Sequence, residues 1–246
     1  MRQVRLLLIL IVAGLGSAHA ADNELTVVGG VDFGFKRLHL DLDRTRTTFS
    51  PSFVTINPNV VLGYGSFYGS VSYDKSVSAD PGIGAQFSAG SPTATMLDYS
   101  RTDSTFTLGY RLLQSLSVFA GHTKGDNHFT ETSFGNTLIV TDISYKEAGP
   151  FAGFAYNHAF GNGTLGLSVG YAKLDGDLRI VSNPGGATTT VSGDTTGLSY
   201  GLTWSGPLTG SLGYRVGLKA TEYNMKEKGE INERYKSIFI GISNYF

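Results

Sequence analysis

The chain contains no cysteine among its 246 residues. This absence excludes disulfides, thiolate nucleophiles and cysteine-ligated metal sites. The chain also lacks an excess of either charge, because it has 19 Lys and Arg residues and 20 Asp and Glu residues. No basic run is present either, which argues against nucleic-acid binding. Phosphate-loop, dinucleotide and calcium-loop motifs are missing too. We therefore expect no cofactor, no metal site and no nucleic-acid partner.

Long hydrophobic runs are absent apart from Leu6–Leu15 near the start of the chain. That run is too short for a membrane-spanning helix, which needs about 20 residues. Two arginines precede it and Ala18–Ala20 follows it as an A-x-A cleavage site, the three-part pattern of a secretory signal peptide. We expect residues 1–20 to be cleaved on export and residues 21–246 to form one domain. If that domain enters a membrane, it must do so as a closed barrel.

Glycine and aromatic residues are abundant instead, with 33 Gly, 13 Tyr and 15 Phe. The stretch Val60–Val77 shows how they are used. Apolar or aromatic residues alternate with small or polar ones on both sides of Gly65–Ser66. Two period-2 runs joined by a Gly-X break predict a β-hairpin, because Gly supplies the positive φ that the turn needs. The rest of the exported chain repeats this pattern about five times.

The pattern predicts an all-β fold, a transmembrane antiparallel up-and-down β-barrel of ten strands, with eight or twelve strands as alternatives. Short connections are expected at Gly65–Ser66, Leu112–Gln114, Ala159–Gly163 and Gly206–Pro207. Long polar loops are expected at Asp43–Ser50, Ser78–Thr95, Gly125–Ser144, Ser182–Val191 and Lys226–Arg234. Aromatic residues stand beside the short connections: Tyr64, Phe67, Tyr110, Tyr156, Phe160 and Trp204. The strands of a soluble β-sandwich also alternate apolar and polar residues. Such a fold, however, requires neither the regular alternation of long and short connections nor the aromatic girdle.

Two strands show irregular patterns. In Leu25–Leu42 the apolar positions slip by one residue after Arg37, which predicts a β-bulge that turns Leu38 and Leu40 to the lipid side. In Phe53–Tyr64 the triplet Asn57–Asn59 contains a proline, which demotes a strand or marks a bulge.

Eight charged residues fall on the faces expected to point inward, four acidic and four basic. They are Asp32, Lys36, Asp74, Arg101, Asp103, Glu147, Arg215 and Lys219. Buried charges persist when they are paired, and a barrel of eight to ten strands is mostly filled by side chains. We therefore expect a salt-bridged interior plug, with a narrow pore lined by the same residues as the alternative.

The last strand, Tyr235–Phe246, resembles the closing strand of Gram-negative outer-membrane β-barrel proteins. Phe246 ends the chain, and Ile238, Ile240 and Ile242 alternate back from it, although Asn244 departs from the hydrophobic pattern. The resemblance identifies a class and no specific family. It implies an outer-membrane location, contact with outer-membrane lipid and lipopolysaccharide, and recognition by the barrel-assembly machinery.

A narrower resemblance is to the omptins, ten-stranded outer-membrane proteases that use an Asp pair and an Asp–His pair to activate water. Asp41 and Asp43 would correspond to the first pair, and Asp126 and His128 to the second. The match stops at these four residues, and such spacings are common in loops. We assign no catalytic residue. The sequence predicts a monomeric, non-enzymatic outer-membrane barrel with a structural or surface-interaction role; the alternatives are a narrow porin-like channel for small solutes and an omptin-like surface protease.

Overall fold

The computed structural model describes most of the exported chain. The described residues are 24–42, 47–79, 82–88, 91–134, 138–183, 185–225 and 231–246. The predicted signal peptide, residues 1–20, and Asp43 lie outside them. No helix long and apolar enough to cross a membrane occurs in the described part of the chain.

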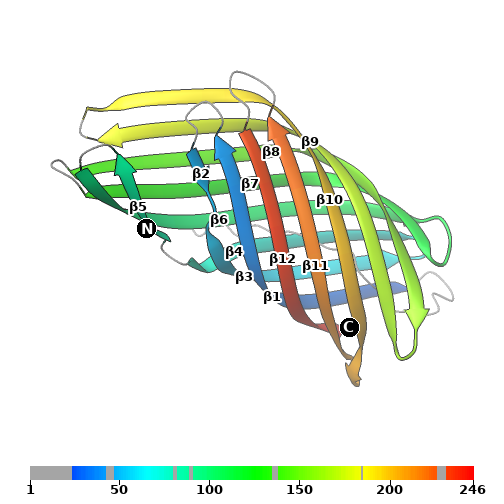
Figure 1. Ribbon diagram of the computed structural model, residues 1–246. Helices are drawn as coiled ribbons and strands as arrows, with labels where there is room; N and C mark the ends of the chain where they lie inside the picture. The colour runs from blue at the N-terminus through cyan, green and yellow to red at the C-terminus, as the bar shows by residue number, and fades with distance from the viewer. Residues whose placement is uncertain are drawn as a thin grey trace, which may run out of the picture.

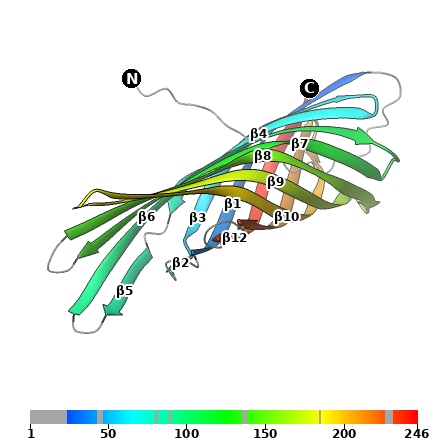
Figure 2. The same ribbon diagram turned by 90° about the horizontal axis from the view of Figure 1, so that it is seen from above.

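Ten long strands form a closed antiparallel barrel, as the sequence predicts (Figures 1 and 2). They are β1 (Leu25–Leu42), β3 (Ser52–Tyr64), β4 (Phe67–Ala79), β6 (Ser91–Arg111), β7 (Leu116–Phe134), β8 (Leu138–Phe160), β9 (Gly163–Asn183), β10 (Ala187–Thr209), β11 (Leu212–Met225) and β12 (Ile231–Tyr245). Each strand pairs with its neighbour in the chain, and the first pairs with the last from Val28–Tyr245 to Leu42–Ile231. Two short strands, β2 (Thr47–Phe49) and β5 (Gly82–Ser88), extend the edges of β1 and β6.

The tight turns gather at one end of the barrel, where three glycines take positive φ. Gly65 has φ +57°, Gly161 has φ +56° and Gly210 has φ +53°. Residues that carry a Cβ rarely adopt this backbone conformation. The expected turn at Gly206–Pro207 is wrong, because both residues continue β10 and pair with β11. The register shifts just after Pro207. Proline is tolerated at such a bulge because it has no N–H to donate to the ladder. The chain turns at Gly210 instead.

The expected long loops at the other end are wrong for most of their length. The segments predicted as Gly125–Ser144 and Ser182–Val191 are largely continuations of β7, β8, β9 and β10. Within Ser78–Thr95, β5 pairs with the start of β6. These polar, Thr-rich stretches resemble loops in composition, but they keep the period of two and pair along their backbones. Figure 1 shows the resulting wall of β6 to β10 projecting beyond β11 and β12.

The polarity of the two faces inverts along several of the long strands, and β9 shows this most clearly. On the outer face, Leu165 to Tyr171 are apolar at every second position, and Lys173 to Arg179 are charged at every second position. On the inner face, glycine and serine give way to buried Leu174 and Leu178. The alternation itself never breaks. The outer apolar belt therefore ends where the barrel leaves the lipid, and beyond it the inside becomes apolar.

This inversion explains why the predicted bulge in β1 is wrong. The pairing of β1 with β12 and with β3 runs without a register shift. Leu38 and Leu40 stay on the inner face and are fully buried, whereas Arg37 points outward. The apparent slip in the sequence marks the change of environment and not a change of register.

Proline at position 58 also leaves its strand intact. Pro58 stands opposite Val31 in an unbroken β1–β3 register, with its side chain on the outer face. The register shift in β3 lies between Val54 and Thr55 in its pairing with β4. Asn57 and Asn59, on either side of the proline, point inward and are buried.

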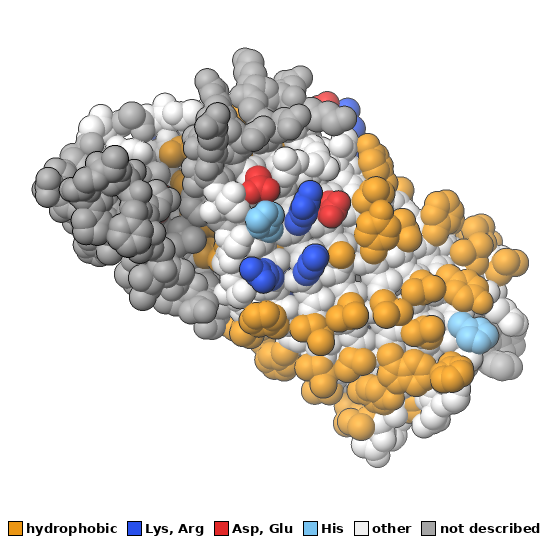
Figure 3. Space-filling view, viewed as in Figure 1, with side chains coloured by type: hydrophobic (Ala, Val, Ile, Leu, Met, Phe, Trp, Pro, Cys, Tyr) orange, Lys and Arg blue, Asp and Glu red, His pale blue; other side chains and the backbone are white. Residues whose placement is uncertain are grey.

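An apolar belt lies between the tight turns and the projecting strand ends, and Figure 3 shows it on one face of the barrel. It consists of outward side chains that are roughly half exposed, such as Phe33, Phe106, Leu167 and Ile240. The aromatic residues expected near the short turns lie at that end: Phe67 packs on Tyr110 at 4.9 Å between ring centroids, and Phe160 packs edge-on against Trp204 at 6.2 Å. Aromatic girdles of this kind are typical of membrane barrels.

We predict that Leu38→Ala destabilises the barrel by about 2–5 kcal/mol, because it leaves a cavity in a packed interior. Lys236→Ala, on the exposed outer face of the adjacent strand β12, should change stability by less than about 0.5 kcal/mol. Urea unfolding of the refolded protein in detergent measures both. Equal stabilities for the two variants would contradict the inward position of Leu38.

Candidate functional site

All eight charged residues singled out in the sequence point into the lumen, and Arg101 on β6 is the centre of the largest group. Its guanidinium group donates to Asp103 at 2.6 Å and to Glu147 on β8 at 2.9 Å. It also crosses the lumen to Glu233 on β12, at 3.0 Å. One side chain thus ties together three walls of the barrel.

Two neutral residues complete this Arg101 network. Asn127 on β7 accepts a hydrogen bond from Arg101 at 2.9 Å and donates one to Glu233 at 3.1 Å. The ring of Tyr235 lies under the guanidinium carbon at 4.1 Å from the ring centroid, and its hydroxyl contacts Arg101 and Glu233. A guanidinium group that stacks on an aromatic ring and makes several hydrogen bonds is held in one geometry. The network therefore connects strands on opposite sides of the lumen.

A second group lies between β1, β4 and β6. The ammonium group of Lys36 is 2.8 Å from Asp74 and 3.9 Å from Asp103, which links this pair to the Arg101 network. Asn57 donates a hydrogen bond to Asp74 at 3.4 Å.

A third group lies nearer the tight turns, where Arg215 on β11 binds Asp32 on β1 through two hydrogen bonds of 2.6 Å. Asn59 donates to the same carboxylate at 3.4 Å. The bidentate geometry makes this a strong pair. Lys219, two inward positions further along β11, has no hydrogen bond or ion pair with any described residue.

Three partners of Arg101 were not among the residues expected from the sequence: Asn127, Glu233 and Tyr235. Asn127 and Glu233 fall in stretches expected to be loops, Gly125–Ser144 and Lys226–Arg234. A strict count of two along β7 from the buried Ser117, and along β12 from Tyr235, would have placed them on the inner face. The sequence contains no signal that pairs Arg101 with a carboxylate 132 residues away.

An apolar cluster fills the lumen on the side of the Arg101 network away from the tight turns. It includes Leu38, Leu40, Phe53, Tyr99, Phe129, Ile143, Tyr145, Leu178, Met225 and Ile231. Tyr99 packs between Phe53 and Phe129 at ring distances of 4.8 and 4.7 Å. Two successive layers of side chains therefore occupy the lumen, a polar network and an apolar one. No group of acidic, His and Cys residues suited to a metal ion occurs in the described ranges.

The residues that resemble an omptin site do not face one another. Asp126 and His128 alternate with buried Asn127 on β7 and therefore lie on the outer wall, where Asp126 is 3.8 Å from Lys146. Asp41 lies on the outer wall of β1, 3.2 Å from His39, and accepts a hydrogen bond from Thr48. These side chains point away from the lumen on separate strands.

The isoleucines that resemble those of a closing strand lie on the lipid-facing side of β12. Ile238, Ile240 and Ile242 are each more than half exposed. The backbone N–H of Phe246 donates to Val27 at 2.9 Å, so the chain end is bound to the first strand.

No protein-family model matches this chain, and no curated protein matches it. Solved structures do. The outer membrane protease OmpT from Escherichia coli has a TM-score of 0.66 and 11% identity, over 92% of this chain and 98% of that one. The chain has the fold of a Gram-negative outer-membrane β-barrel. The translocator domain of the autotransporter NalP from Neisseria meningitidis also matches this barrel, with a TM-score of 0.53 and 9% identity, over 93% and 90% of the two chains. Such identities show the fold alone, and the apolar belt supports a location in the outer membrane.

We predict that Arg101→Ala destabilises the folded barrel by about 3–5 kcal/mol, because it leaves Asp103, Glu147 and Glu233 buried without their cation. Arg234→Ala is the control, since Arg234 is exposed and 3.7 Å from Glu222, and such pairs contribute at most about 1 kcal/mol. Urea unfolding in detergent compares the two. A small effect of Arg101→Ala would mean that the network does not hold the walls together.

We predict strong coupling between Arg215 and Asp32. Arg215→Met alone should cost about 3–5 kcal/mol, because Asp32 stays buried and charged. Adding Asp32→Asn should recover most of this loss, since no charge then remains unpaired. A double-mutant cycle on unfolding free energies measures the coupling, and additive effects would contradict the pairing.

Proposed function

We propose that the protein is a closed, non-enzymatic outer-membrane barrel that presents its projecting strands as an interaction surface at the cell exterior. The observation that carries this proposal is that side chains occupy the lumen at two levels, in the Arg101 network and in the apolar cluster. A barrel filled in this way is poorly suited to diffusion of solutes. What remains available for recognition is its outer surface beyond the lipid.

The projecting strands have the properties of such a surface. The outer face of β9 beyond the belt carries exposed Lys173, Asp175, Asp177 and Arg179. Thr188, Thr189 and Thr190 are exposed near the tip of β10. The paired backbones make this a rigid scaffold, on which exposed polar side chains keep fixed positions.

The surroundings of the barrel form part of the same proposal. Export through the signal peptide, insertion by the barrel-assembly machinery through β12 and a monomeric state agree with the closed sheet and with the outward Ile238 to Ile242. Contact with lipopolysaccharide is supported by exposed cations beside the belt. Arg37 stands directly opposite Lys236 in the β1–β12 pair, and neither forms an ion pair with a described residue. Anionic lipid headgroups would relieve their mutual repulsion.

The positions of the residues that resemble an omptin site support the non-enzymatic part of the proposal. An Asp–His pair needs the His within hydrogen-bond reach of a water held beside its substrate. His128 and Asp126 share the outer wall with Lys146, and Asp41 is engaged by His39 and Thr48 on another strand.

We predict that the refolded protein shows no steady single-channel conductance in a planar bilayer. Arg101→Ala should stay closed as well, because the apolar cluster remains in place. Steady conductance of the wild type, altered by Arg101→Ala, would overturn the proposal in favour of a narrow pore lined by the inward charges.

We also predict that the projecting end faces the cell exterior. The absence of native cysteine makes single-cysteine labelling direct. Thr189→Cys, near the tip of β10, should react with a membrane-impermeant maleimide on intact cells, whereas Ser211→Cys at a tight turn should react only after lysis. The reverse pattern would rule out a role at the cell surface.

A further inference from the structure

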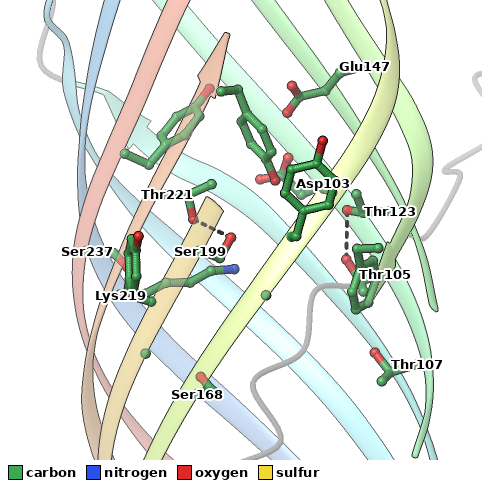
Figure 4. Close-up of a pocket in the computed structure, with 18 of the residues that line it drawn as sticks. Asp103, Thr105, Thr107, Thr123, Glu147, Ser168, Ser199, Lys219, Thr221 and Ser237 are labelled. Atoms are coloured by element: carbon green, nitrogen blue, oxygen red, sulfur yellow. Dashed lines mark hydrogen bonds between the residues drawn. The ribbon is translucent and has the colours of Figure 1, made fainter. Parts of the chain in front are cut away.

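A cavity of about 120 Å³ lies in the lumen on the tight-turn side of the Arg101 network (Figure 4). Hydroxyl groups from six strands line it: Thr105, Thr107, Thr123, Ser168, Ser199, Thr221 and Ser237. Each carries a donor that rotates to suit a ligand. Two hydrogen bonds between hydroxyl groups join neighbouring strands at the edge of the cavity. Ser199 and Thr221 are 3.1 Å apart, and Thr105 and Thr123 are 2.9 Å apart. The cavity has room for several waters or for one small polar molecule.

Lys219 extends from β11 into this cavity, as Figure 4 shows. It differs from the other inward cations in having no hydrogen bond or ion pair with a described residue. Lys36, Arg101 and Arg215 each contact a carboxylate within 3.0 Å. An ammonium group held away from bulk water without an anion is costly.

The inward carboxylates of this part of the lumen already have other partners. Asp103 binds Arg101 and lies near Lys36, and Asp74 binds Lys36 at 2.8 Å. Glu147 also binds Arg101, at 2.9 Å. Among the charged residues that line the cavity, Lys36, Arg101 and Lys219 are basic, and Asp103 and Glu147 are acidic. The lining therefore has one positive charge in excess, which an anion from outside the chain would balance.

We propose that this cavity binds a small oxyanion, a carboxylate or a phosphate, with Lys219 as its cationic partner. The ammonium group supplies three N–H donors, and Ser199, Thr221 and Ser237 supply hydroxyl donors from the neighbouring strands. This site lies inside the barrel, so it is independent of the surface role proposed above. Lys219 also differs from Arg101 and Arg215, because its side chain connects no two strands.

The test uses inorganic phosphate and acetate as probes on the full exported chain refolded in detergent. Isothermal titration calorimetry at constant ionic strength measures binding to the wild type, with chloride as the reference anion. Lys219→Met should weaken binding at least about tenfold, because a charge-assisted hydrogen bond is lost. Lys219→Arg should retain it. Lys124→Met, which removes an exposed lysine from the outer face of β7, should bind as the wild type does.

Stability gives a second readout that does not depend on the heat of binding. An anion bound only by the folded barrel raises the urea midpoint in proportion to the logarithm of its concentration. We expect phosphate to raise the midpoint of the wild type and of Lys124→Met, and to leave Lys219→Met unchanged. In phosphate-free buffer Lys219→Met should fold at least as well as the wild type, since it removes an unpaired charge. No phosphate response in the wild type, or an equal response in Lys219→Met, would show that the cavity holds water only.

Discussion

The structure depends on the pairing of the first strand with the last. A strand in lipid has no water to satisfy its N–H and C=O groups, so the sheet has to close on itself. The β1–β12 ladder does this over fifteen residue pairs, and the terminal Phe246 adds a hydrogen bond to Val27. Because the sheet closes in this way, the side chains of one face are forced into a narrow lumen. The packing of that lumen then decides what the protein can do.

The inside of the barrel is organised in layers. Near the tight turns, Arg215 and Asp32 join neighbouring walls; further along, Arg101 joins opposite walls, and beyond it the interior becomes apolar around Tyr99. The order follows from the environment outside. Where lipid covers the outer face, the inner face carries the polar groups. Where water covers the outer face, Leu38 and Leu174 form a core like that of a soluble protein.

Charge pairing in the lumen separates residues that hold the barrel from one that does not. Arg101, Lys36 and Arg215 are each bound to carboxylates of other strands, so their contribution is to join the walls. Lys219 projects into a cavity lined by hydroxyl groups and joins nothing. The same type of residue, on the same kind of inward position, therefore has two different surroundings.

Period-two alternation and the glycine turns were enough to predict ten strands and which charges point inward, because both depend only on neighbouring residues. The same local reasoning failed at Leu38, at Gly206–Pro207 and in the polar strand ends. There, the solvent around the strand, and not its own pattern, decides what is buried. The partners of Arg101 also required the tertiary structure. Glu233 lies 132 residues away in the chain, and only closure of the sheet brings β6 and β12 across one lumen.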